Sequence, residues 1–141
     1  MNLTQISVFI ENRAGQLSNI TKVLFENGVD LRAINIAETQ DYGVLRIIPA
    51  DAQKASAVLL ENGFIMAMTP VLAVAVPDRP GGLNSLLETL AGADIGIEYM
   101  YSVFSSKSGE ALMVLQVNEA QKAADTLKEN NFRFVDIEEI R

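Results

Sequence analysis

Two six-residue stretches decide the fold: Asp78-Arg79-Pro80-Gly81-Gly82-Leu83 matches Asn12-Arg13-Ala14-Gly15-Gln16-Leu17 after a shift of 66 residues. Further along the chain the shift becomes 68, and residues 51–55 and 61–64 match residues 119–123 and 129–132. The two extra residues fall around 105–109, where Ser, Lys and Gly favour a turn that tolerates insertion. Because the matched blocks follow one another in the same order, the chain is predicted to be a tandem duplication.

Each copy predicts the same order of secondary structure. Alternating apolar residues predict strands at Ile6–Ile10 and Leu72–Val76, and each strand leads into a helix with an apolar stripe of helical spacing. Asn27-Gly28 is a stop signal for the first of these helices. The first copy continues with strands over 29–38 and 44–48 around a turn at 41–43, a helix over 51–62 and a strand over 65–69. The second continues with strands over 95–104 and 111–117 around a turn at 107–109, a helix over 119–131 and a strand over 133–140.

The predicted order is therefore β-α-β-β-α-β, twice. Right-handed crossovers place both helices of such a unit on one face of a four-stranded antiparallel sheet, which is the ferredoxin-like α+β fold. We expect one domain over residues 1–69 and a second over residues 70–141, with Thr69-Pro70 as the join between two separate strands. A unit of this size has a thin core and exposed sheet edges, which favours pairing of whole chains into a homodimer.

Composition excludes many kinds of chemistry. The 141 residues carry a net charge of −7 and include no His, Cys or Trp. Thiolate, disulfide, zinc-cysteine and histidine-relay chemistry are therefore excluded, and we expect neither a metal site nor a cofactor. An acidic surface repels phosphate backbones, and no apolar run is long enough to span a bilayer, so neither nucleic acid nor a membrane is an expected partner. With no secretory signal at the N-terminus, we expect a cytoplasmic protein. We also expect no catalytic residue.

The stretches 12–17 and 78–83, called the first loop and the second loop below, allow two interpretations. In one they only start helices, with Asn12 or Asp78 as the cap and Pro80 in the first turn. In the other, the glycines let a small ligand approach the helix N-terminus, whose N–H groups can receive a carboxylate. The matched residues Arg13 and Arg79 could clamp an anion, but exposed basic residues that balance an acidic surface are the favoured explanation.

The second loop and the duplicated topology resemble the ACT domain, a small-molecule regulatory module of amino-acid metabolism. Residues 78–83 match the family's D-[RK]-P-G-x-L turn throughout, whereas the first loop departs from it at Asn12 and Ala14. The resemblance covers essentially the whole chain as two copies. It implies that a free amino acid binds where two ACT units meet, between the loop of one unit and the second strand of its neighbour.

Carried over by position, the resemblance implies a set of ligand-binding residues in the two loops and on the two second strands. Backbone N–H groups around Gly15-Gln16 or Gly81-Gly82 would hold the ligand carboxylate, and Asn12 or Asp78 would hold its ammonium group. The full set is Asn12, Arg13, Ala14, Gly15, Gln16, Leu17, Asn35, Asp78, Arg79, Pro80, Gly81, Gly82, Leu83 and Tyr101. Whether one loop binds or both, and which amino acid is bound, stays open at this point.

Three classes of function follow. The first is a regulatory protein that binds an amino acid and acts on a separate chain, for which the family's habits suggest an amino-acid biosynthetic enzyme. The second is an assembly protein without a ligand, whose loops only start helices. The third is an enzyme on a ferredoxin-like scaffold, which would need a clustered pair of carboxylates or lysines that the sequence does not indicate. Stabilisation by an added amino acid separates the first class from the second.

Overall fold

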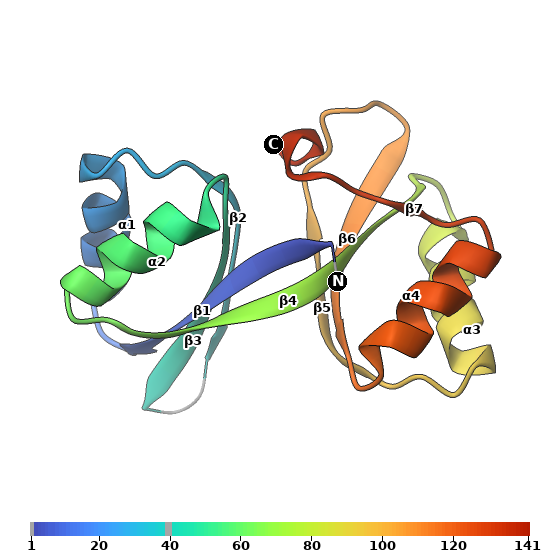
Figure 1. Ribbon diagram of the computed structural model, residues 1–141, viewed down its shortest axis with the longest axis horizontal. Coiled ribbons are helices and arrows are strands. Elements are labelled where there is room, and N and C mark those ends of the chain that lie inside the picture. Colours follow the sequence, from blue (N-terminus) through green and yellow to red (C-terminus); the bar gives the residue numbers. More distant parts are fainter. Residues whose placement is uncertain (1, 39–40) are drawn as a thin grey trace. The chain divides into compact units, whose positions relative to one another are not determined.

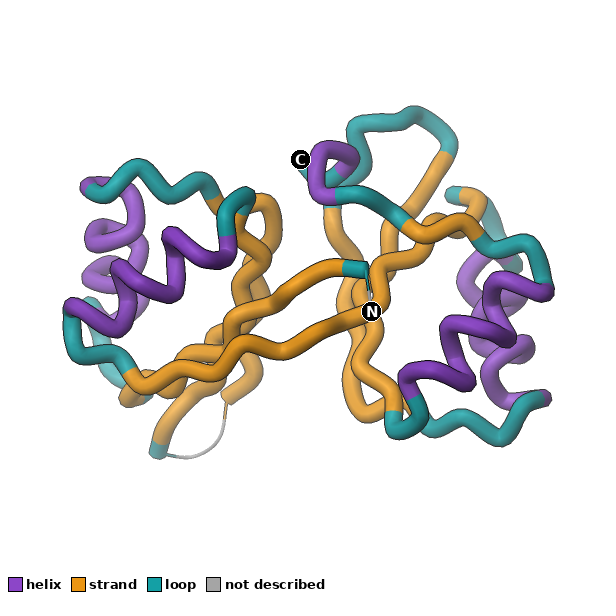
Figure 2. Tube along the Cα trace, viewed as in Figure 1, coloured by secondary structure: helices purple, strands orange, loops and turns teal. Residues whose placement is uncertain are grey.

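The protein is described by a computed structural model that covers residues 2–38 and 41–141 (Figure 1). The chain divides into two compact units. The first unit is Thr4–Thr69, and the second is Pro70–Arg141 together with Asn2 and Leu3. Figure 2 shows that each unit combines strands with helices.

The first unit contains the predicted order of elements. They are strand β1 (Leu3–Glu11), helix α1 (Gln16–Glu26), strands β2 (Leu31–Glu38) and β3 (Tyr42–Pro49), helix α2 (Ala52–Glu61) and the beginning of strand β4 (Ile65–Pro77). Helix α1 ends at the predicted stop, with Asn27 as its C-cap and Gly28 at a φ of 71°. Asp51 caps α2 by accepting a hydrogen bond from the backbone N–H of Lys54 at 3.1 Å.

The second unit repeats this order. It contains the remainder of β4, helix α3 (Gly82–Gly92), strands β5 (Ile97–Val103) and β6 (Glu110–Val117), helix α4 (Ala120–Glu129), strand β7 (Arg133–Phe134) and the short 3-10 helix η1 (Ile137–Glu139). The strands lie in the order β2-β3-β1-β4 in the first unit and β5-β6-β4-β7 in the second. These orders are equivalent, and the ladders between β1, β2 and β3 and between β4, β5, β6 and β7 are antiparallel. The ferredoxin-like α+β fold is confirmed.

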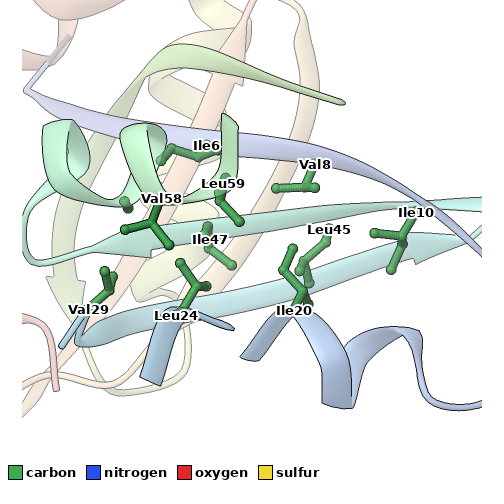
Figure 3. Packing of buried hydrophobic residues seen from close by; sticks show 11 residues of the cluster. Ile6, Val8, Ile10, Ile20, Leu24, Val29, Leu45, Ile47, Val58 and Leu59 are labelled. Atoms are coloured by element: carbon green, nitrogen blue, oxygen red, sulfur yellow. The ribbon is translucent and has the colours of Figure 1, made fainter. Parts of the chain in front are cut away.

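Each unit has its own apolar core between the sheet and the helices. In the first unit, Ile20 and Leu24 of α1 are buried together with Leu45 and Ile47 of β3 (Figure 3). Val58 and Leu59 of α2 and Ile6, Val8 and Ile10 of β1 complete this cluster. The second core is built from matching positions, among them Leu72, Val74, Leu86, Leu90 and Leu115. None of the described helices has the length and apolar character needed to cross a membrane.

Strand β4 differs from the prediction. The sequence predicts two strands separated by Thr69-Pro70, but β4 is one strand of 13 residues that runs through both. Proline lacks only one backbone hydrogen-bond donor, and its fixed φ is compatible with extended backbone. The residue before a proline is also biased towards extended backbone. Thr69-Pro70 can therefore continue the strand. The side chain of Asn2 supports the second unit beside β4: it donates to the carbonyls of Ala73 and Val135, and it accepts from the N–H of Ala73 at 2.9 Å.

Further boundaries also differ from the prediction: the strands expected to begin at residues 29 and 95 begin at Leu31 and Ile97, and the helix expected over 119–131 spans Ala120–Glu129. The last strand was expected over 133–140, but β7 ends at Phe134, and Asp136 and Glu139 form a capping box that starts η1. Local hydrogen bonds of these two polar residues replace the strand ladder. The predicted turn at 41–43 is shorter as well, because Tyr42 and Gly43 already pair with β1 as part of β3.

Candidate functional site

The second loop is held in place by its backbone. The N–H of Asp78 donates to the carbonyl of Gly109 at 3.0 Å, that of Arg79 to Pro77 at 2.9 Å and that of Gly82 to Arg79 at 3.0 Å. The first loop has the three equivalent bonds, from Asn12 to Asp41 at 3.4 Å, from Arg13 to Glu11 at 3.0 Å and from Gln16 to Arg13 at 3.4 Å. The two loops therefore share one backbone design, with longer bonds in the first.

Neither α1 nor α3 has a side-chain cap. Their N-caps are Gly15 and Gly81, which adopt left-handed φ values of 89° and 92°, and no side chain bonds to either helix start. The prediction that Asn12 or Asp78 caps the helix is therefore wrong, as is the placement of Pro80 in the first turn. A glycine at positive φ turns the chain into the helix, and a loop carbonyl takes the first N–H, so no polar side chain is required.

This arrangement leaves N–H groups of the first helical turn open to a ligand. The first four N–H groups of a helix lack partners within it and carry partial positive charge. No hydrogen bond within the described residues engages the N–H groups of Leu17 and Ser18 in α1 or of Leu83 and Asn84 in α3. Each helix start can therefore accept an anionic group such as a carboxylate.

Gly82 is a position where no side chain fits. A Cβ placed there would lie 2.0 Å from the carbonyl oxygen of Pro77, whereas a Cβ on Gly15 or Gly81 would meet nothing within 4 Å. Gly81 is thus required for its backbone conformation and Gly82 for its close approach to β4. The equivalent of Gly82 in the first loop is Gln16, so this close approach belongs to the second loop.

The remaining loop residues are mostly exposed. Asn12, Ala14, Leu17, Asp78, Arg79, Pro80 and Leu83 all lie at the surface, whereas Gln16 is half-buried. Arg13 is engaged within its own loop: its Nε lies 3.3 Å from a carboxylate oxygen of Glu11. With the Gln16 amide oxygen turned towards the guanidinium, it accepts from Nε and Nη2 of Arg13 at 2.7 and 2.6 Å. The structure gives Arg79 no ion pair among the described residues.

Asn35 and Tyr101, the predicted residues on the second strands, occupy equivalent places in β2 and β5. Asn35 pairs with Arg46, which donates from Nη1 to Asn35 Oδ1 at 3.5 Å, and Tyr101 is 9% exposed and pairs with Val114. Arg46 in turn pairs with Ser7, which lies about 16 Å before Asn12 along β1 at roughly 3.3 Å per residue. Asn35 therefore lies too far from the first loop to share a ligand with it within one unit.

A groove that sequence reasoning missed lies beside each loop. The first groove has a volume of about 420 Å³ and the second about 500 Å³. The first is lined by Phe9, Ile10, Glu11, Gln16, Asn19, Tyr42, Asn62, Gly63, Phe64 and Ile65. The second is lined by Ala75, Val76, Pro77, Ser85, Gly109, Glu110, Asn130, Asn131, Phe132 and Arg133. Nearly all of these positions correspond between the repeats, and the matching blocks 61–64 and 129–132 are the sequence signal that could have found them.

The two grooves differ in chemistry. Around the first, Phe9 and Tyr42 are half exposed, whereas the second has alanine and glutamate at the matching positions 75 and 110. Glu110 forms an ion pair with Arg133 at the second groove. Of the predicted site residues only Gln16 lines a groove, so the grooves adjoin the loops without being formed by them.

The charged groups of the second unit form a network at the C-terminus. Lys107 donates to Glu139 at 2.7 Å, and Arg133 donates to Glu139 at 2.6 Å and bonds to Glu110. Hydrogen bonding from Lys107, from the N–H of Asp136 and from Arg133 lowers the pKa of Glu139 to about 2. Among the described residues, no group of three acidic side chains is placed to hold a metal ion.

Comparisons with known proteins agree with this architecture. The family model of the ACT domain pair matches residues 1–141. The crystal structure of protein BT0572 from Bacteroides thetaiotaomicron is similar, with 36% identity, a TM-score of 0.89 and coverage of 96% of this chain and 92% of that one. The regulatory subunit of aspartate kinase from Thermus thermophilus shares the fold at 15% identity, with a TM-score of 0.66 and coverage of 93% and 94%. Among curated proteins, none matched the chain.

Proposed function

Because the chain belongs to the family of ACT domain pairs, we propose that it is a non-catalytic regulatory protein that binds a free amino acid where two ACT units meet. The observation that carries the proposal is the pair of glycine-started helices without side-chain caps. Such a helix start offers N–H groups and partial positive charge without offering a nucleophile or a general base. A free amino acid presents the matching carboxylate.

The proposed roles follow from the loop geometry. In the second loop, the N–H groups of Leu83 and Asn84 would hold the carboxylate, because that of Gly82 already donates to the loop. The exposed Asp78 carboxylate would hold the α-ammonium group. In the first loop, Asn12 replaces this aspartate, and its amide can both accept and donate. The two loops therefore offer different partners for the ammonium group, and we propose that the second loop binds more tightly.

The regulated partner is proposed to be an enzyme on a separate chain. A regulatory subunit of aspartate kinase from Thermus thermophilus shares this fold, and an amino-acid biosynthetic enzyme is the proposed class of partner. In this mechanism the ligand binds one arrangement of a homodimer more tightly than another and so shifts the equilibrium towards the arrangement that it prefers. The alternative is an assembly protein without a ligand, favoured by the exposed apolar side chains of the first unit.

Thermal unfolding in the presence of each of the twenty amino acids at millimolar concentration tests the proposal. A ligand at a hundredfold excess over Kd stabilises the native state by about 2.7 kcal/mol, which raises the midpoint by several degrees. We expect one amino acid to do so, with Asp78→Ala removing the effect and Asn12→Ala as the matched variant in the other loop. No stabilisation by any amino acid would favour the assembly protein instead.

A further inference from the structure

The first groove has an apolar lining that the second groove lacks. Phe9 is 47% exposed, Tyr42 50% and Ile65 71%, and all three line the first groove. The second groove has an alanine, a glutamate and an arginine at the matching positions 75, 110 and 133. The duplication therefore provides an internal control, because the same fold builds a groove at the same place without these apolar side chains.

The three side chains share one face of the sheet. Tyr42 of β3 pairs with Glu11 of β1, and Phe9 lies two residues before Glu11 and so on the same face. Strand β4 lies beside β1, and its Met66 packs against the core of the first unit. Because successive side chains of a strand alternate between faces, Ile65 points away from the core, as Phe9 does. Three neighbouring strands thus contribute to one apolar surface.

The second groove satisfies its own polar groups at the same positions. Glu110 and Arg133 form an ion pair there, and Arg133 also donates to Glu139 at 2.6 Å. The equivalents of this ion pair in the first groove are Tyr42 and Ile65, which leave half or more of their surface exposed to water. The first groove therefore has an apolar surface where the second has an internal ion pair.

The rim of the first groove is acidic. Glu11 lines the groove, Asp41 and Glu61 directly precede the lining residues 42 and 62, and all three are exposed. Arg13 is the basic residue at this rim, and its Nε lies 3.3 Å from Glu11. Lys22, further along α1, lies 3.9 Å from a glutamate of its own helix. Three carboxylates against one guanidinium leave a net charge of −2, which attracts a basic segment and repels an acidic one.

We propose that the first groove docks a segment of a separate protein chain in which large apolar residues are flanked by lysine or arginine. An apolar side chain of this segment would pack against Phe9, Tyr42 and Ile65, and its flanking cations would face the carboxylates of the rim and the aromatic rings. With about 200 Å² for a large side chain, the exposed fractions give roughly 340 Å² of surface. A standard interface buries about 800 Å² per partner, so this contact is small enough to be reversible.

The groove also adjoins the first loop, and the inference rests on the proposed function for the existence of a partner chain. Gln16 belongs to both the first loop and the first groove. Arg13 of this loop contacts two groove residues, Glu11 at 3.3 Å and, with its amide oxygen turned towards the guanidinium, Gln16 at 2.7 Å. A ligand on the N–H groups of Leu17 and Ser18 would therefore bind next to residues that line the docking groove. Such proximity allows each to change the affinity for the other.

Peptide titration of the full chain tests the docking. The probes are acetylated hexapeptide amides with two lysines on each side of a Leu-Leu, Phe-Phe or Trp-Trp pair, added without any free amino acid. In nitrogen-15 spectra, we expect at least one probe to shift the N–H signals of Tyr42, Gly63 and Ile65 saturably at millimolar concentration. The signals of Asn131 and Arg133 in the second groove should not move. Control peptides with glutamate in place of lysine, or Ala-Ala in place of the apolar pair, should bind about tenfold more weakly or worse.

Three results of this titration would overturn the proposal. The first is the absence of shifts at the first groove with every lysine-flanked apolar probe. The second is equal binding of the glutamate or alanine control peptides. The third is movement of the groove signals on dilution of the protein alone, because a second copy of the chain would then occupy the groove.

Variants that exchange the chemistry of the two grooves provide the second measurement. Tyr42→Glu combined with Ile65→Arg places the residues of the second groove at exposed positions of the first without changing the net charge. The Kd of the tightest probe should rise about tenfold or more, with an unchanged far-UV circular dichroism spectrum. Should this variant unfold, Phe9→Ala, which introduces the residue of the matching position 75, should show the same loss. The matched control is Phe25→Ala, since Phe25 is 77% exposed on α1 outside the groove, and it should bind as the wild type does.

Wild-type affinity in the groove variants, or an equal loss in Phe25→Ala, would overturn the proposal. The peptide titrations contain no amino acid, and the thermal unfolding that tests the proposed function contains no peptide. This inference and the proposed function therefore fail separately.

Discussion

Substitution of Gly82 by alanine tests the geometry of the second loop. The added Cβ would lie 2.0 Å from the carbonyl oxygen of Pro77, whereas ordinary contacts begin near 3.4 Å. The obstructing atom is backbone, so relief requires movement of β4 or of the start of α3 by about 1 Å or more. Overpacking of this kind costs about 1–3 kcal/mol. We therefore expect Gly82→Ala to lower the free energy of unfolding by about 2 kcal/mol, although alanine favours helix formation intrinsically.

The assay is thermal and urea unfolding followed by circular dichroism. For a unit of this size, 2 kcal/mol corresponds to a fall of roughly 10 °C in the midpoint. The matched control is Gln16→Ala at the equivalent position of the first loop, which already carries a Cβ. This variant loses only the surface hydrogen bonds from Arg13 and should cost about 1 kcal/mol or less. Gly81→Ala distinguishes backbone strain from steric overlap, because the added Cβ would meet no atom within 4 Å but the backbone φ is 92°. This variant should lower the free energy of unfolding by about 1 kcal/mol. A Gly82→Ala variant as stable as the wild type would refute the reasoning.

Two further predictions concern the second unit. Asn2→Ala removes three hydrogen bonds to Ala73 and Val135, and at about 0.5–1.5 kcal/mol each it should lower the free energy of unfolding by about 1.5–4.5 kcal/mol; an unchanged urea midpoint would contradict this. The pKa of Glu139 is lowered to about 2, chiefly by its hydrogen bond from Lys107, so its contribution to stability is complete above its unfolded pKa of about 4.5 and is lost as pH falls through 2. Urea unfolding across this window should show a weaker pH dependence for Glu139→Gln, and an identical dependence would count against the network.

The duplicated fold could be predicted because the apolar patterns are strong in both copies. Alternation at Ile6–Ile10 and the helical stripe of Ile20 and Leu24 translate directly into the buried core of the first unit. Strand β4 was missed because Thr69-Pro70 resembles a break, yet a proline removes only one backbone donor. The C-terminal segment was missed because Val135 and Ile140 are buried, as in a strand, while the capping box between them decides the local structure.

The place of the two loops at helix starts could also be predicted, but their internal geometry could not. The motif locates both loops at helix starts, as the structure has them. Gly15 and Gly81 are the N-caps because of their backbone angles. The sequence alone does not show this, because Asn12 and Asp78 are also suitable cap residues. The grooves combine segments distant in the chain, and Ile34 and Ile36 are exposed although apolar because their strand, β2, lies at the end of the strand order. Both features need the three-dimensional arrangement.

The most direct test of the central claim is the response of the backbone amides themselves. In a nitrogen-15 spectrum of the labelled protein, titration with the stabilising amino acid should shift the N–H signals of Leu83 and Asn84, or of Leu17 and Ser18, with one common Kd. These are the groups that the described structure leaves without a partner at the helix starts. Saturable shifts confined to other residues, with these signals unmoved, would contradict the account.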